Sequence, residues 1–324
     1  MGMAYRMKLG LWIGLAAAFG LAGPVAAQPT APALADPEGN VVEELVVVAR
    51  VVGPAWWRVS DDDTTVYILA LPDSFLPRDL KWDQAGLNRR LKGSNALIGG
   101  GRSYKLGLRN IPLLLSLRRS LRTKGTMEDD LPEPLRARFV ALREGLGKDA
   151  RHYAGWGPMV AGFTLVGDAR DGPRGRDAED QVRAAARKLG VRERKLETRD
   201  AAPLIKEFKT GLTMDIQTAC LDAAMVDVEA GQSVAQEAAK GWARGDVGAA
   251  LKAPRGFEKC LLVISGGAEA WRQTVDAQAG EIAQALTAPG KAVAMVRLRP
   301  LIAKGGVIET LEAMGLEVEG PAER

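Results

Sequence analysis

The chain has 324 residues, 47% of them hydrophobic, with 44 basic side chains against 40 acidic ones. This length and apolar content suit one large domain or two smaller ones, so core size does not limit stability. The net charge of only +4 excludes the basic surplus typical of nucleic-acid-binding proteins. We therefore expect no nucleic-acid partner.

Residues 1–27 have the pattern of a secretory signal peptide. Two basic residues precede an apolar run at 9–21, and Val25-Ala26-Ala27 has the small side chains of a cleavage site. We expect an exported, periplasmic protein with no transmembrane anchor after cleavage, since no later stretch is long and apolar enough to span a bilayer. An uncleaved anchor is the alternative.

The chain has two cysteines, Cys220 and Cys260. In an oxidising compartment we expect a disulfide between them, and its loop of about 40 residues would contribute on the order of 3–4 kcal/mol in the chain-entropy model. Two buried free thiols are the alternative. A cysteine nucleophile is not expected, because its base would have to be the single histidine, His152. A lone loop histidine is more typical of a surface residue.

The segment 28–53 is expected to be a flexible lead-in. It is rich in proline, alanine and small polar residues, although the β-branched run at 44–52 has the composition of an edge strand. The rest of the chain, 54–321, is expected to form the folded domain.

The clearest local pattern is a β-hairpin at 56–70. Apolar residues alternate with more polar ones on both sides of a polar turn at 60–63. Pro72 and Pro77 lack an N–H and cannot continue the strand pairing, so Asp73 follows directly at a strand end. The alternating apolar residues are Trp57, Val59, Val66, Ile68 and Ala70.

Further strands are predicted near both ends of the chain, and helices dominate between them. The other strands are expected at 95–98, 191–198, 292–298 and 317–319. Helices are expected at 83–92, 133–146, 156–166, 177–189, 201–209, 214–231, 233–244, 258–264, 271–286 and 306–314. This order favours an α/β fold whose sheet is built from N- and C-terminal strands, with a largely helical middle section.

Gly99-Gly100-Gly101 follow the strand at 95–98. Their backbone N–H groups could form an anion-binding nest, and a flexible turn is the plainer alternative. The glycine spacing is neither that of a P-loop nor that of a Rossmann fold, so no nucleotide cofactor is expected.

The next segment, 102–124, has seven basic residues and no acidic one. Its apolar residues recur at helical spacing, which predicts a basic amphipathic helix after Pro112. Such a helix can lie on an anionic lipid or polysaccharide surface; the alternative is a solvated basic face beside a buried apolar stripe. The stripe consists of Ile111, Leu114, Leu115, Leu117 and Leu121.

From 54 to 321 the chain resembles the TraB/GumN family, to which the Tiki proteases are related. The resemblance lies in several short motifs that occur in the family's order. The motifs are Trp57-Arg58-Val59, Tyr67-Ile68-Leu69-Ala70-Leu71-Pro72-Asp73, Ala96-Leu97-Ile98-Gly99-Gly100, Lys195-Leu196-Glu197-Thr198, Gly241-Trp242-Ala243-Arg244-Gly245-Asp246 and the closing strand, loop and helix at 293–315.

What the resemblance implies is a metal-dependent hydrolase, in which two Gly-x-x-His motifs, a Glu and an Arg meet at strand ends. None of these positions has the expected residue in this chain. Ala70 and Asp73 stand for the first Gly and His, Gly100 or Gly99 for the Glu, Arg297 and the region of Pro300 for the second Gly and His, and the region of Thr274 for the Arg.

A hydrolytic metal needs several histidine or carboxylate ligands, and Asp73 alone remains at these positions. We therefore expect no metal and no other cofactor. Arg297 and Arg299 place positive charge where the metal would lie, so an ion pair from one of them to Asp73 is expected instead.

These substitutions favour a catalytically inactive family member that works in the periplasm as a binding or scaffold protein. Its candidate vestigial pocket would contain Asp73, Gly100, Arg297 and Arg299, and would favour an anionic ligand. The alternative is a hydrolase of altered, metal-independent chemistry that uses Asp73 and Arg297.

Glu197 could be a second carboxylate for that hydrolase, although it is more typical of a residue that caps the next helix. A third hypothesis is a polyanion binder that acts through the basic helix, with salt-sensitive binding.

Overall fold

The structure, a computed structural model, describes residues 36–43, 53–73, 76–101, 104–169 and 177–321. The predicted signal peptide at 1–27 and the β-branched run at 44–52 lie outside the described residues.

The predicted hairpin is confirmed. β1 (Trp56–Ser60) and β2 (Thr64–Leu71) pair antiparallel. The Asp61 carboxylate accepts the backbone N–H of Thr64 at 2.8 Å, which closes the turn. β1 alternates between buried and more exposed residues, whereas the last four residues of β2 are all buried, as expected of a strand covered on both faces.

Six strands form one mixed sheet in the order β5-β3-β7-β2-β1-β8. β7 (Gly290–Arg297) runs parallel to both β2 and β3 (Ala96–Ile98), and the edges are β5 (Glu193–Arg194) and β8 (Val318–Glu319). The predicted α/β fold is confirmed. The strand expected at 191–198 is only two residues long, because it is an edge strand whose sole partner is the short β3.

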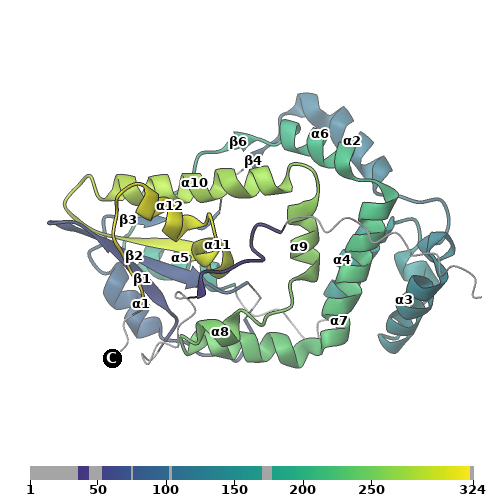
Figure 1. The fold of residues 1–324 in the computed structure, drawn as a ribbon, viewed down its shortest axis with the longest axis horizontal. Coiled ribbons are helices and arrows are strands. Elements are labelled where there is room, and N and C mark those ends of the chain that lie inside the picture. The colour runs from purple at the N-terminus through teal and green to yellow at the C-terminus, as the bar shows by residue number, and fades with distance from the viewer. Residues whose placement is uncertain (1–35, 44–52, 74–75, 102–103, 170–176, 322–324) are drawn as a thin grey trace, which may run out of the picture. The chain divides into compact units, whose positions relative to one another are not determined.

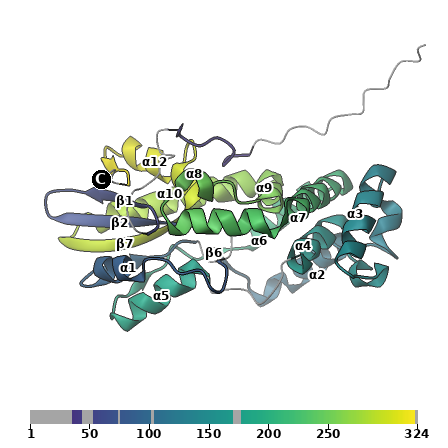
Figure 2. The ribbon, with the colours of Figure 1, turned by 90° about the horizontal axis from the view of Figure 1, so that it is seen from below.

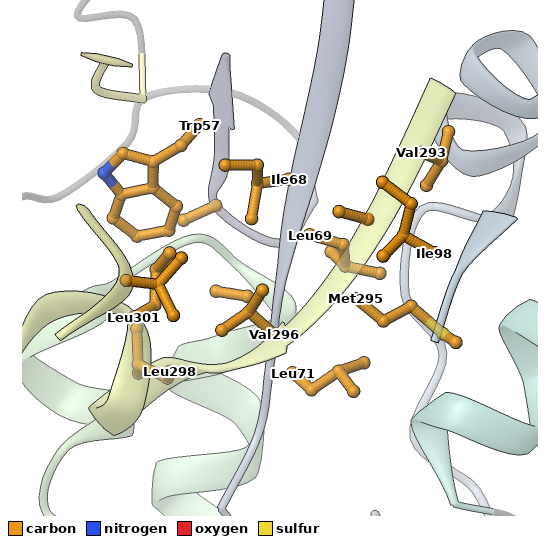
Figure 3. Packing of buried hydrophobic residues seen from close by; sticks show 14 of the residues in the cluster. Trp57, Ile68, Leu69, Leu71, Ile98, Val293, Met295, Val296, Leu298 and Leu301 are labelled. Carbon is orange, nitrogen blue, oxygen red and sulfur yellow. The ribbon is translucent and has the colours of Figure 1, made fainter. Parts of the chain in front are cut away.

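Helices cover both faces of this sheet (Figure 2). α1 (Gln84–Leu91) and α5 (Ala178–Lys188) lie on one face. α10 (Gly267–Ala285) and α12 (Val307–Ala313) pack together on the other, and the short α11 (Leu298–Ile302) directly follows β7. The core between the layers is made of fully buried apolar side chains (Figure 3), among them Trp57, Ile68, Val296 and Leu301.

The middle of the chain forms a helical region beside the sheet (Figure 1). Its helices are α2 (Ile111–Ser120), α3 (Glu133–Gly145), α4 (Pro158–Asp168), α6 (Ala202–Gly211), α7 (Met214–Ala243), α8 (Val247–Ala250) and α9 (Gly256–Val263). Its shorter elements are the 3₁₀ turns Leu108–Asn110, Met127–Asp130 and Ala150–Tyr153 and the paired strands β4 (Tyr104–Lys105) and β6 (Arg199–Asp200).

α7 connects the helical region to the sheet. Leu221 in its first half is buried in a core of the helical region, and Trp242 near its end is buried in the core of the sheet. We predicted two helices here, 214–231 and 233–244. The structure confirms this break: the range labelled α7 consists of two helical segments that meet at a kink at Gly231, whose φ of 77° is a left-handed conformation that glycine adopts without strain.

The predicted disulfide between Cys220 and Cys260 is present. It joins α7 to α9 with a Cα–Cα distance of 5.3 Å, inside a small apolar cluster of the helical region. Among the described residues, no helix combines the length and apolar character that crossing a membrane requires.

Candidate functional site

β2, β3 and β7 run parallel to one another, so their carboxyl ends lie side by side. We call this end of the strands the carboxyl edge of the sheet, as distinct from its edge strands β5 and β8. Asp73 lies just beyond β2, Gly100 just beyond β3, and Arg297 is the last residue of β7. Arg299 follows in α11. The fold therefore brings the four positions singled out by sequence to the same edge.

Asp73 and Arg299 form a buried ion pair. The Arg299 Nε lies 3.3 Å from Asp73 Oδ2, and their side chains are only 12% and 4% exposed. Neither of these two atoms has an aligned hydrogen bond, so the contact is electrostatic. The Arg299 Nη2 donates to the Leu251 carbonyl, which fixes the guanidinium in place.

A second buried pairing lies beside the first. Arg255 contacts Asp36 at 2.8 Å and Glu38 at 2.6 Å, and all three side chains are almost fully buried. The indole N–H of Trp271 also donates to Glu38 Oε1 at 3.1 Å. Sequence reasoning missed these three charged residues.

The two acids lie in the segment 36–43, which is part of the lead-in expected over 28–53. This segment packs along the end of α11, where Val41 pairs with Ala303 and Val42 N–H donates to the Ile302 carbonyl at 3.0 Å. The ion pairs to Arg255 hold it in place. Asp36 and Glu38 are the only charged residues in 28–42. Their isolation in an otherwise uncharged segment was the one feature of the sequence that could have marked them.

Arg297 pairs instead with Glu258 of α9, at 3.4 Å between Nη1 and Oε1. Both side chains are about half exposed, so this pair lies at the rim of the buried charges. We call the seven charged residues at this edge of the sheet the carboxyl-end cluster: Asp36, Glu38, Asp73, Arg255, Glu258, Arg297 and Arg299.

The carboxyl-end cluster has four carboxyl groups and three guanidinium groups. Burial raises the pKa of Glu38 to about 7, against the opposing attraction of Arg255 and with added repulsion from Asp73. Burial and repulsion from Glu258 raise the pKa of Asp73 to about 6, against the attraction of Arg299. Glu38 and Asp73 therefore keep a proton to a higher pH than an ordinary carboxyl group does.

Gly100, which stands for the glutamate of the resemblance, is closely surrounded. A Cβ built on it would lie 3.2 Å from Glu179 Oε1 and 3.2 Å from the Met295 carbonyl oxygen. The buried Gln278 donates its amide N–H to the Gly100 carbonyl. The Glu179 carboxylate pairs with Arg183 at 2.6 Å. The space beside Gly100 is therefore already filled.

The implied metal does not fit this donor set. The only carboxylate at the expected ligand positions, Asp73, faces Arg299, and Pro300 has no side-chain donor. The Thr274 hydroxyl donates to the Ala270 carbonyl within α10. Within the described ranges, no group of three or more His, Cys, Asp or Glu side chains could hold a metal ion.

Two other sequence candidates lie elsewhere. His152 contacts Asp168 Oδ2 through Nε2 at 2.7 Å in the helical region. Glu197 is exposed and pairs with Arg199 at 3.4 Å. The expected helix cap by Glu197 is wrong, because Asp200 accepts the N–H of Ala202 at the start of α6.

The family-like motifs support the strand ends. The indole N–H of Trp242 donates to the carbonyl of Ala70 at 2.7 Å, next to the end of β2. Asp246 in the same motif accepts the N–H of Ala249 and caps α8. These contacts support the end of β2 and the start of α8.

A model of the TraB/PrgY/gumN family matches residues 55–320, a range that contains every strand of the six-stranded sheet. No curated protein and no solved structure matches the chain.

Proposed function

The chain belongs to the TraB/PrgY/gumN family, and we propose that it is a catalytically inactive member that works in the periplasm as a binding or scaffold protein. The observation that carries this proposal is the buried Asp73–Arg299 ion pair at the carboxyl edge of the sheet. A guanidinium group lies against Asp73, the one carboxylate at the ligand positions that the family resemblance implies.

The burial of Asp73 also supports an inactive site. The Asp73 side chain is 4% exposed, and an acid or base must come within hydrogen-bonding reach of its substrate. Arg299 is held by two contacts, to Asp73 and to the Leu251 carbonyl. Freeing Asp73 for chemistry would leave both of these buried charges without their partners, which is costly.

The competing proposal is a metal-independent hydrolase that uses Asp73 and Arg297. The raised pKa of Asp73, about 6, favours it, because acid–base groups often have such values. The pairing of Arg297 with Glu258 disfavours it, since this guanidinium is already neutralised by a carboxylate.

A peptidase assay separates the two proposals. The mature chain is incubated with a mixture of unstructured peptides, with and without added Zn²⁺ or Mn²⁺, and cleavage is followed by mass spectrometry. We expect no cleavage by the wild type, by Asp73→Ala, or by Asp62→Ala, the matched control, which removes an exposed carboxylate of the hairpin turn. Cleavage that is lost in Asp73→Ala and retained in Asp62→Ala would contradict inactivity.

Export is tested separately. The full-length chain with a C-terminal tag is expressed in a Gram-negative host, and the cells are fractionated by osmotic shock. We expect the protein in the periplasmic fraction, with a mass that corresponds to a start near Gln28. An uncleaved protein in the membrane pellet would contradict this part of the proposal.

A further inference from the structure

α2 is amphipathic, yet none of its residues is buried. Of the predicted stripe, Ile111, Leu114 and Leu115 are exposed and only Leu117 and Leu121 are half-buried, so the stripe as a whole is not buried. Large apolar side chains of α2 and of the turn before it are widely exposed. They are Leu108 at 86%, Ile111 at 48%, Leu114 at 42% and Leu115 at 48%.

The exposed apolar residues share a face with arginines. At 3.6 residues per turn, Leu108, Ile111 and Leu115 fall on one side of the helix. Arg118 and Arg119 continue that side through the last turn. We call these five residues the α2 face.

The opposite side of α2 accounts for its packing on the protein. Leu113 and Leu117 are half-buried, and Leu121 packs against the apolar cluster that contains the disulfide. α2 also lies beside α6 (Figure 1). The core thus uses one side of the helix only, and the α2 face is left to solvent.

Several basic side chains lie on or near this face. Within the described part of the chain, neither Arg118 nor Arg119 forms an ion pair, and the same holds for Arg109 and Lys105. Arg122 stacks on the Trp156 ring at 4.8 Å. In contrast, the three arginines of the carboxyl-end cluster each pair with a carboxylate.

We propose that the α2 face docks on the surface of an anionic lipid membrane. Exposed leucine and isoleucine side chains beside arginines are what an interfacial helix needs: the apolar groups enter the boundary of the acyl chains, and the guanidinium groups bind lipid phosphates. The absence of any acid from 102–124 complements a negatively charged surface. This inference goes beyond the proposed function and does not depend on catalytic inactivity.

Vesicle co-sedimentation tests the proposal. The mature chain is mixed with vesicles of equal parts phosphatidylglycerol and phosphatidylcholine, and with vesicles of phosphatidylcholine alone, at rising salt. We expect binding to the anionic vesicles that falls as salt rises, and much weaker binding to the neutral ones. Equal binding to both, indifferent to salt, would overturn the proposal.

Two variants locate the surface. Arg118→Glu/Arg119→Glu should weaken binding to anionic vesicles by about tenfold or more, since each basic residue near such a surface is worth several-fold in affinity. Its matched control is Arg187→Glu/Lys188→Glu, an exposed basic pair in the last turn of α5, which should bind as the wild type does. Equal losses in the two variants would contradict docking through α2.

A further double variant tests the apolar residues of the α2 face. Ile111→Ser/Leu115→Ser should lose most vesicle binding and keep its circular dichroism spectrum, because these residues are exposed. Met314→Ser, a half-exposed apolar residue of the sheet region, is the control. If these leucine and isoleucine residues instead join two copies of the chain, light scattering would show a dimer that the Ile111/Leu115 variant loses, and vesicles would not bind.

Discussion

The carboxyl-end cluster and α2 both contain several arginines, which are mostly buried in the first and exposed in the second. Arg255 and Arg299 are almost fully buried against three carboxylates, whereas Arg118 and Arg119 are exposed and, among the described residues, unpaired. A buried arginine has already exchanged water for a fixed partner, so it is not available to a ligand, and removing either member of the pair is costly. An exposed, unpaired arginine remains available. The carboxyl-end cluster is thus closed to ligands, and the basic helix α2 is open to them.

The largest effect is expected from removing Arg255. Its loss leaves Asp36 and Glu38 buried without a counter-charge, so Arg255→Ala should lower the free energy of unfolding by about 3–5 kcal/mol at neutral pH. Urea denaturation measures this change. Arg118→Ala, its counterpart in α2, should stay within about 0.5 kcal/mol of the wild type. Similar losses in both variants would remove the contrast between the two regions.

The disulfide comes next. Reducing Cys220–Cys260 should cost about 3–4 kcal/mol, because it removes a cross-link over a sequence separation of 40 residues. Urea denaturation with and without dithiothreitol measures the loss, with the Cys220→Ser/Cys260→Ser variant as the reference that dithiothreitol should not affect. A wild type that is equally stable in both buffers would show that the helical region beside α2 does not need the bridge.

The carboxyl-end cluster should also make stability depend on pH. The pKa of Glu38 rises from 4.5 to about 7 on folding, so the folded chain holds this proton more tightly than the unfolded chain. This contribution is fully present below about pH 4.5 and is lost as the pH rises through about 7. The free energy of unfolding lost across this range is about 3 kcal/mol.

The comparison that isolates this effect is Glu38→Gln, which keeps an acceptor for the Trp271 indole and cannot ionise. Relative to this variant, the wild type should lose unfolding free energy between about pH 5 and pH 8. Parallel pH profiles for the two proteins would mean that Glu38 is ionised throughout.

A smaller loss is expected at Gly100. Gly100→Ala places a methyl group 3.2 Å from both Glu179 Oε1 and the Met295 carbonyl, and should cost about 1–3 kcal/mol. Gly101→Ala is the control, since a Cβ there meets no atom within 4 Å. Thermal unfolding of both variants measures the difference, and equal stability would mean that the space beside Gly100 is not filled.

The sequence predicted those features that depend on neighbouring residues. The alternation around Trp57 and Ile68 defines the hairpin, and Asp177 caps α5 as expected. An ion pair between Asp73 and an arginine at the end of the last long strand was also predicted correctly, because parallel strands end at the same side of a sheet and Arg299 forms this pair. Local pattern and sheet geometry were sufficient for this part of the site.

The sequence could not predict contacts that depend on distant packing. Arg255 meets Asp36 across a separation of 219 residues, and no periodicity connects the two. The stripe on α2 has the spacing of a buried helix face, yet pattern alone does not tell whether another element covers Ile111 and Leu115.

The measurement that tests the central claim most directly is the metal content of the mature chain. The protein is equilibrated with Zn²⁺ or Mn²⁺, passed through gel filtration, and analysed by mass spectrometry of the metal. Because Arg299 faces Asp73, we expect no retained metal in the wild type, in Asp73→Ala or in the Asp62→Ala control. One ion per chain in the wild type and in Asp62→Ala, lost in Asp73→Ala, would contradict a closed and inactive site.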